Sequence, residues 1–278
     1  MKSFNHKSGK YFDIAEAKIY YEETGSKSGS VLLFLHGGFG TLEDFNIMIS
    51  GLSDEFRIIG IDSRGQGKST LGNEKLTYQQ IQLDVEALLY SLDIESVSII
   101  GFSDGGMVAY RMAISSTLKI KKIIAIDAPW SLQDLTVNKE IYAKITAESW
   151  KEKFPDSYKT YQKLNPEIDF NILTSALKEM WLDEGITGGY PDENVNKINC
   201  PTLIIRGDDD HLFSRKSATE LSDSIKDAMF LNIPFAEHES FKDQPEIVKI
   251  VVNQFLDNAN NSKKKNNDNR KSNLHRTS

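Results

Sequence analysis

The stretch VSIIGFSDGG, residues 97–106, decides the fold of this chain, because an apolar run passes directly into a Gly-x-Ser-x-Gly pattern. A strand that ends in this pattern and turns at once into a helix holds its serine in a tight corner, with the hydroxyl exposed at the edge of the sheet. The corner needs glycine at 101 and 105, since larger side chains would collide with neighbouring backbone there. The helical pattern of residues 107–113 favours this placement. The segment therefore predicts Ser103 as a nucleophile.

Short apolar runs recur on both sides of this corner, with helical patterns between them. Such alternation is typical of strands joined by crossover helices into a parallel sheet. Residues 77–80, TYQQ, read as a capping box that opens one of these helices. We expect the first two strands to form an antiparallel hairpin. The eight predicted strands cover residues 10–14, 17–22, 31–35, 57–61, 97–101, 121–126, 201–206 and 228–233.

The alternation stops after Pro129 and resumes at Cys200. Residues 130–196 carry amphipathic helical stretches and no convincing strand pattern, and they contain all three tryptophans. We therefore expect a helical lid inserted between two strands, whose aromatic residues pack against the core more often than they contact a substrate. The predicted division is a core of residues 1–129 and 197–257, a lid of residues 130–196 and a tail of residues 258–278.

Charge is distributed unevenly along the 278 residues. The formal net charge is −7, yet the tail is basic and rich in Asn and Lys, so the rest of the chain is more acidic than the whole. An acidic body argues against general nucleic-acid binding, which would need a basic stripe. The polar tail has no apolar periodicity and is predicted to be disordered.

Composition also constrains the compartment of the protein. Cys200 is the only cysteine, so no internal disulfide can form, and its apolar context favours a buried thiol. The first ten residues lack the apolar centre of a secretory signal, and no apolar run reaches the length of a membrane span. We expect a cytoplasmic protein without a membrane span.

Two cofactor patterns are rejected. The segment GQGKS, residues 65–69, ends like a nucleotide-binding loop, but the first glycine that this motif requires is replaced by Asp62. The histidines and the cysteine show no metal-ligand spacing. The sequence therefore predicts neither a metal nor an organic cofactor.

A serine hydroxyl becomes an effective nucleophile when a histidine takes its proton and a carboxylate orients that histidine. His238 lies in a loop after the last predicted strand, and Asp210 lies just past the end of the seventh. These strand ends are where a parallel sheet places its active site. Ser103, Asp210 and His238 thus occur in the order nucleophile, acid, base, which is typical of one fold.

The remaining histidines are weaker candidates for the base. His6 and His275 lie near the termini and are set aside. His36 follows the third predicted strand and reads as a hydrogen-bonded turn residue. His211 and His238 remain, and the loop position of His238 after the last predicted strand makes it the predicted base.

At five separate places the chain resembles the α/β-hydrolase family. Besides the elbow, HGGFG at residues 36–40 is similar to the family's oxyanion turn, and DSRGQGKS at 62–69 to its structural loop. GDDD at 207–210 resembles the acid loop and AEH at 236–238 the base loop, although Glu237 replaces the usual small residue. The resemblance implies an α/β-hydrolase fold, an eight-stranded, mostly parallel sheet flanked by helices, with a helical lid after the sixth strand.

The same resemblance assigns the oxyanion hole. The two backbone N–H donors would be those of Asp104 and Gly38, with Phe39 as the fallback for the second. Phe39 and Asp104 are also candidate substrate-binding residues. Asp104 itself could be the nucleophile, as in dehalogenases and epoxide hydrolases of this fold, but bulky Phe102 would then occupy a position that must be small.

Rival acids exist as well. Asp210 fits the family's G-x-x-D spacing better than Asp208 or Asp209. Asp127, after the sixth predicted strand, corresponds to the acid of some relatives and is the structural alternative.

The resemblance implies a serine hydrolase that cleaves a small carboxylic ester through an acyl-enzyme. Alternatives are a prolyl-aminopeptidase-like or C–C bond hydrolase, and, from another class, a non-catalytic or slow small-molecule receptor. Asp104 bears on the substrate, because similar Ser-Asp-Gly-Gly elbows occur in biphenyl-hydrolase-like members. Facing the pocket, it would favour substrates with a cationic amine. Otherwise it is an acid that stabilises a helix N-terminus.

Overall fold

The computed structural model describes residues 3–50, 52, 54–185 and 188–257. In this part of the chain eight strands form one sheet with the order β1-β2-β4-β3-β5-β6-β7-β8. The pairs β1–β2 and β2–β4 are antiparallel and the others parallel, so the predicted hairpin and the mostly parallel sheet are confirmed. The strands are β1 (Lys10–Ile14), β2 (Ala17–Gly25), β3 (Ser30–Leu35), β4 (Phe56–Ile61), β5 (Ser96–Phe102), β6 (Lys119–Ile126), β7 (Thr202–Gly207) and β8 (Ala228–Ile233).

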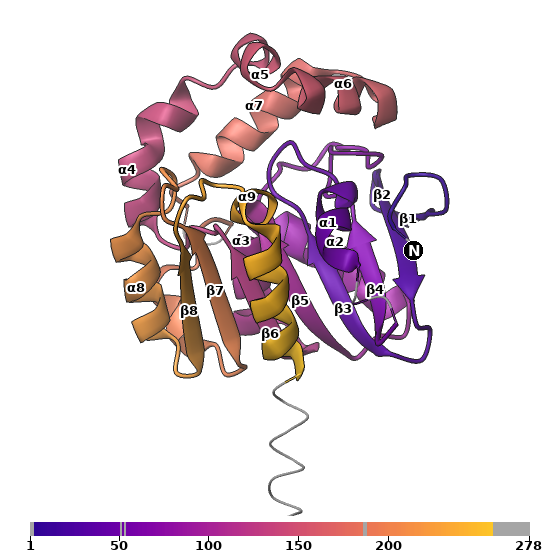
Figure 1. Cartoon of the computed structure of the whole chain (residues 1–278). Helices are drawn as coiled ribbons and strands as arrows, with labels where there is room; N and C mark the ends of the chain where they lie inside the picture. The colour runs from indigo at the N-terminus through magenta and orange to yellow at the C-terminus, as the bar shows by residue number, and fades with distance from the viewer. Residues whose placement is uncertain (1–2, 51, 53, 186–187, 258–278) are drawn as a thin grey trace, which may run out of the picture.

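Helices cover both faces of the sheet (Figure 1). One face packs against α2 (Tyr78–Ser91), α3 (Asp104–Ser115) and α8 (Arg215–Ser224). The other packs against α1 (Asn46–Ile49) and a helix over residues 245–257, next to the short α9 (Ser240–Asp243). The apolar runs of the central strands follow from this, because a strand covered on both faces has no solvent side.

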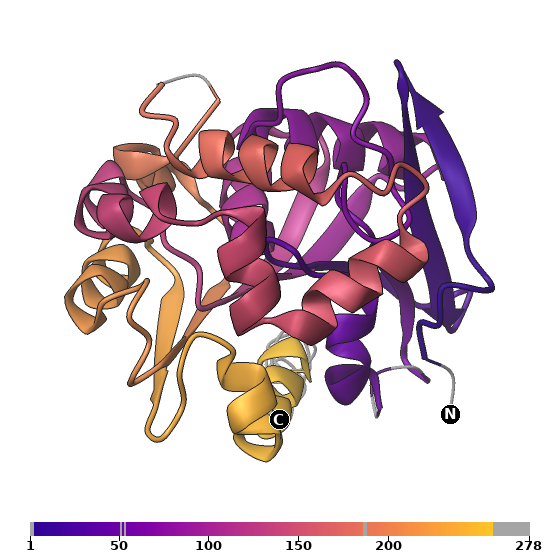
Figure 2. The same cartoon turned by 90° about the horizontal axis from the view of Figure 1, so that it is seen from above.

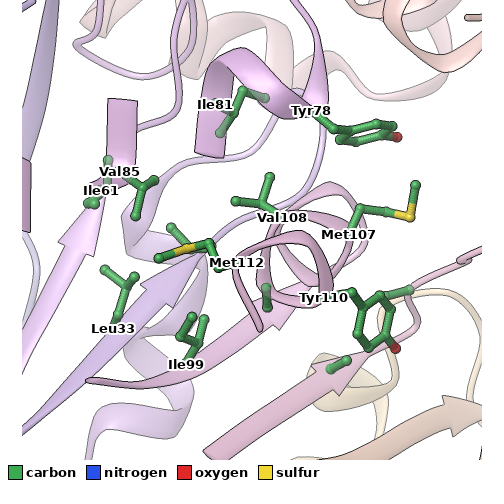
Figure 3. Close-up of a cluster of buried hydrophobic side chains, with 14 of the residues drawn as sticks. Leu33, Ile61, Tyr78, Ile81, Val85, Ile99, Met107, Val108, Tyr110 and Met112 are labelled. Carbon is green, nitrogen blue, oxygen red and sulfur yellow. The ribbon is translucent and has the colours of Figure 1, made fainter. Parts of the chain in front are cut away.

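Alternate residues of β3 show the two faces directly. Leu33 belongs to the cluster beneath α2 and α3, while Leu32 and Phe34 belong to the cluster on the opposite face. Figure 3 shows Leu33 and Ile99 from neighbouring strands pointing towards side chains of α2 and α3. These two clusters hold the strand ends, and the loops that follow them, in fixed positions.

The start of α2 departs in part from prediction. Thr77 caps the helix by accepting a hydrogen bond from the backbone N–H of Gln80, as expected. The side chain of Gln80 does not close a capping box but donates to Asp84, at 3.0 Å. Asp84 also receives two hydrogen bonds from the buried guanidinium of Arg64, which ties the loop after β4 to α2.

Between β6 and β7 the chain forms α4 (Leu132–Ala143), α5 (Ala147–Lys153), α6 (Pro155–Leu164), α7 (Phe170–Trp181) and the 3-10 helix η2 (Asp192–Lys197). Figure 1 shows α4 to α7 gathered beyond one end of the sheet, and Figure 2 shows them spread across that end. This is the end at which β6 leads into α4. The treatment of residues 130–196 as a lid separate from the core stays a prediction, and the predicted tail, residues 258–278, lies outside the described residues.

Within the described ranges, no helix combines the length and apolar character needed to cross a membrane.

Candidate active site

The predicted nucleophile lies in a strained corner between β5 and α3. Ser103 has φ 49° and ψ −115°, a backbone conformation that costs a non-glycine residue on the order of 1–3 kcal/mol. A Cβ atom on Gly101 would lie 2.3 Å from the carbonyl oxygen of Gly105, and one on Gly105 would lie 1.9 Å from that of Leu35. Both glycines are therefore required by close backbone approach, as the sequence pattern indicated.

The structure brings Ser103, His238 and Asp210 together. His238 Nε2 lies 3.1 Å from Ser103 Oγ, and His238 Nδ1 lies 3.0 Å from Asp210 Oδ2. The Asp210 side chain is fully buried, whereas the His238 side chain is 18% exposed. Burial lowers the pKa of His238, but the hydrogen bond and charge of Asp210 outweigh this effect and raise it above 6.5. The arrangement can pass a proton from Ser103 to His238 and hold the resulting imidazolium.

Asp210 is fixed by its own loop. Its Oδ1 atom accepts hydrogen bonds from the backbone N–H of Leu212, at 2.8 Å, and of Phe213, at 3.3 Å. Asp208 points elsewhere, to Arg215 and Asn232. The geometry thus favours Asp210 over Asp208 as the partner of the histidine.

The alternative acid, Asp127, is buried at the end of β6 but accepts hydrogen bonds from Gly207 and Ser240 rather than from the histidine. Its Oδ1 accepts from Gly207 N at 2.8 Å, and its Oδ2 accepts from Ser240 N and Oγ at 2.9 and 2.6 Å. Burial raises the pKa of Asp127 to about 7. Because Gly207 begins the acid loop and Ser240 follows His238, this carboxyl group ties the two loops together.

The turn after β3 packs against the nucleophile. A Cβ atom on Gly37 would lie 3.0 Å from the Cβ of Ser103, and Phe39 has a φ of 57°. His36 serves the turn, as expected. Its Nδ1 lies 2.7 Å from the carbonyl oxygen of Gly37, and its Nε2 accepts a hydrogen bond from Ser63 N. The turn that contains Gly38 therefore lies against the serine, and Asp104, the first residue of α3, directly follows it.

The Asp104 side chain is buried between the core and α7. Its Oδ1 accepts a hydrogen bond from the Tyr78 hydroxyl at 2.8 Å, and both carboxylate oxygens lie 3.0 Å from Trp181 Nε1. Burial raises the pKa of Asp104, and these two donors oppose the rise. A Cβ atom on Gly38 would lie 2.5 Å from the Trp181 ring, so the indole also covers the candidate oxyanion turn. Sequence reasoning missed both partners: Tyr78 was noted only as part of a capping box, and Trp181 was counted among the packing aromatic residues of the lid.

Phe39 is held by aromatic side chains of the helical segment. Its ring centroid lies 3.9 Å from that of Trp150, 5.3 Å from Phe170 and 5.7 Å from Trp181. Ser157 Oγ donates to the carbonyl oxygen of Phe39. Next to it lies a cavity of about 10 Å³, the space of a single water molecule. Phe39 therefore contacts residues of α5, α6 and α7.

In the described part of the chain, no cluster of three or more His, Cys, Asp or Glu side chains is arranged to hold a metal ion.

Comparison with known proteins gives a consistent family. The model of the alpha/beta hydrolase fold matches residues 30–170. The AB hydrolase superfamily protein YisY of Bacillus subtilis is 29% identical, over 85% of this chain and 94% of that protein. The bifunctional esterase/perhydrolase DCH of Acinetobacter calcoaceticus is 25% identical, over 79% of this chain and 89% of that protein. Among solved structures, naproxen esterase from Bacillus subtilis superposes with a TM-score of 0.67 at 19% identity, covering 90% of this chain and 91% of that one.

Proposed function

The chain belongs to the α/β-hydrolase fold family, and on that premise we propose that it is a serine hydrolase acting on small carboxylic esters. The observation that carries the proposal is the continuous path from Ser103 Oγ through His238 to the buried Asp210. The esterase names of two similar proteins support the choice of an ester.

The proposed reaction proceeds through an acyl-enzyme. Ser103 Oγ bonds to the ester carbonyl carbon while its proton passes to His238 Nε2. The negative charge on the carbonyl oxygen would be stabilised by the N–H groups of Gly38 and Asp104. His238 then protonates the leaving alcohol oxygen as the ester C–O bond breaks. A water molecule, deprotonated by His238, cleaves the acyl-enzyme and returns Ser103 to its starting state.

We also propose that the helical segment acts as a lid and that the protein is cytoplasmic. Residues 130–196 would act as a lid, supported by the contacts of Trp181 and Phe39 across the boundary. A cytoplasmic location is supported by the free, buried thiol of Cys200, which suits a reducing compartment.

The test is hydrolysis of p-nitrophenyl esters of increasing acyl length. We expect Ser103→Ala to lower kcat on the order of 10⁶-fold. Ser96→Ala, at the opposite end of the same strand, is the matched control and should leave the rate unchanged. A fluorophosphonate probe should label Ser103, as identified by peptide mass spectrometry. Absence of both turnover and labelling would overturn the proposed enzymatic activity and favour a receptor. Turnover of prolyl amides alone would favour a peptidase.

A further inference from the structure

His6 lies near the start of the chain, yet its side chain is buried. The residue is 4% exposed, so it is not the solvated terminal histidine that its position suggests. Its Nδ1 lies 2.5 Å from Glu43 Oε1 and its Nε2 lies 2.8 Å from Asp62 Oδ2. Carboxylate oxygens only accept hydrogen bonds, so both ring nitrogens must donate, and a histidine can do this only as the imidazolium.

The charged and titratable groups around the ring agree with a positive charge. Besides the two carboxylates, the Tyr20 ring stacks on the imidazole at 5.6 Å, and Tyr11 lies edge-on to Tyr20. Glu22 accepts a hydrogen bond from the Tyr20 hydroxyl. Lys68 is the facing cation, and its ammonium donates to the His6 carbonyl oxygen. The three acidic groups named here, Glu43, Asp62 and Glu22, outnumber Lys68.

The two carboxylates lead to the turn that follows β3. Glu43 belongs to the 3-10 helix η1 (Leu42–Phe45), which begins two residues after Gly40. Asp62 Oδ1 accepts a hydrogen bond from the backbone N–H of Leu42 at 2.9 Å. His6 therefore holds one side of η1 in two ways. It contacts the side chain of Glu43 directly, and it contacts Asp62, which accepts a hydrogen bond from the backbone of Leu42.

The other side of η1 is held from the base loop. Asp44 accepts a hydrogen bond from the Lys242 ammonium of α9 at 2.9 Å, and its second oxygen accepts from the backbone N–H of Thr41. Lys242 also donates to Glu239, the residue after His238. Two neighbouring carboxylates of η1, which follows the turn bearing Gly38, are thus each held by a cationic side chain, Glu43 by His6 and Asp44 by Lys242.

We propose that His6, as an imidazolium, is a positioning residue that fixes η1 and thereby keeps the Gly38 turn against Ser103. The proposal rests on the proposed function, in which Gly38 donates to the oxyanion. A neutral imidazole keeps a single N–H. Asp62 is 0% exposed, so that N–H would stay on Asp62, which also holds the backbone donors of Leu42 and Lys68, and the hydrogen bond to Glu43 of η1 would be lost.

The pH dependence has a defined sign. Burial lowers the pKa of His6, but the hydrogen bonds and charges of Asp62 and Glu43 outweigh it and raise the pKa above 6.5. The stabilisation is fully present below pH 6.5 and is lost as the pH rises through the raised value. Wild-type kcat should therefore fall as the pH rises through the pKa of His6.

The test compares His6→Gln with Lys7→Gln, which removes an exposed neighbouring cation. We expect His6→Gln to lower kcat for p-nitrophenyl acetate about ten- to a hundredfold with little change in KM, because a displaced turn misplaces the oxyanion donor. The backbone amide of Leu42 should exchange with solvent at least about tenfold faster. Lys7→Gln should change neither quantity. Wild-type values of kcat and of Leu42 exchange in His6→Gln would overturn the proposal.

A measurement on the wild type keeps the proposal testable if His6→Gln does not fold. NMR titration of the His6 ring and Leu42 amide exchange between pH 6 and 10 should share one midpoint, after correction for intrinsic base catalysis. Protection that stays constant through the His6 titration overturns the proposal. The exchange data need no ester. A protein without esterase activity would therefore refute the proposed function, while the role of His6 in fixing η1 would still be judged by Leu42 exchange.

Discussion

Asp210 and Asp104 are two buried carboxylates near Ser103, and their hydrogen-bond partners indicate a catalytic role for one and a structural role for the other. Asp210 is 4% exposed and Asp104 is 7% exposed, so burial does not distinguish them. Asp210 meets the imidazole of His238, a partner that can gain a proton, whereas Asp104 meets the hydroxyl of Tyr78 and the indole of Trp181. A carboxylate beside a histidine can stabilise a charge that appears during a reaction. One beside neutral donors is satisfied at all times and holds the structure together.

The comparison also bears on the substrate. An amine-binding role for Asp104 would need a carboxylate oxygen directed at an open pocket. Both oxygens accept hydrogen bonds from protein donors instead, and the ring of Trp181 covers the adjacent Gly38. We therefore interpret Asp104 as the residue that joins α7 to the elbow, and the predictions below test this difference between the two carboxylates.

The largest expected effect is that of Asp210→Asn. An amide can donate to His238 Nδ1 and favour the wrong tautomer, so we expect kcat to fall about 10⁴-fold with little change in KM. Steady-state ester hydrolysis measures the loss, and the rate of fluorophosphonate labelling should fall in parallel. A variant that keeps a tenth of the wild-type rate would show that the acid is another residue, with Asp127 as the next to replace.

A smaller effect is expected at Asp127, whose raised pKa makes stability depend on pH. Between about pH 4 and 7 the folded state binds more protons than the unfolded state, so the contribution of Asp127 to stability falls as the pH rises. The total is on the order of 4 kcal/mol at most. In Asp127→Asn this dependence should disappear, and kcat should fall about tenfold because the amide has one acceptor oxygen instead of two, so one of the two loops loses its acceptor.

Urea unfolding at several pH values measures the Asp127 contribution. Asp223→Asn, which removes an exposed carboxylate from α8, is the matched control and should follow the wild-type curve. Parallel pH profiles for Asp127→Asn and the wild type would mean that Asp127 does not change its ionisation in this range.

The sequence predicted the residues that handle the proton, Ser103, Asp210 and His238, far better than the aromatic contacts around Asp104 and Phe39. Ser103, Asp210 and His238 each follow a strand, and parallel strands bring their carboxyl ends to one edge, so local pattern and topology together locate them. The contact of Trp181 with Asp104 joins residues 77 positions apart through the packing of α7 on the core. Helical periodicity predicts a helix but not the partner of each side chain. His6 escaped notice because a position near a terminus suggests solvent.

The smallest expected effect concerns the contact between Asp104 and Trp181, and a double-mutant cycle measures it. Asp104→Asn replaces one of the two acceptor oxygens by an NH2 group that cannot accept, and Trp181→Phe removes the donor, so each weakens the same interaction and should lower the free energy of unfolding by about 1–3 kcal/mol. The double variant should lose less than the sum of the two. Trp150→Phe is the matched control, because Trp150 packs on Phe39 and donates to Ser157 rather than to Asp104, so its effect should add to that of Asp104→Asn.

Substrate preference decides between the two roles of Asp104 in the same variants. As a residue that joins α7 to the elbow, it should leave the ratio of kcat/KM for aminoacyl and plain acyl esters unchanged in Asp104→Asn. Trp181→Phe should behave alike, because it breaks the same bond without touching the charge. A selective loss of aminoacyl ester turnover in Asp104→Asn alone would mean that the carboxylate leaves Trp181 to bind a substrate amine. Asp104 and Asp210 would then both act in the active site, Asp104 on the substrate and Asp210 on His238.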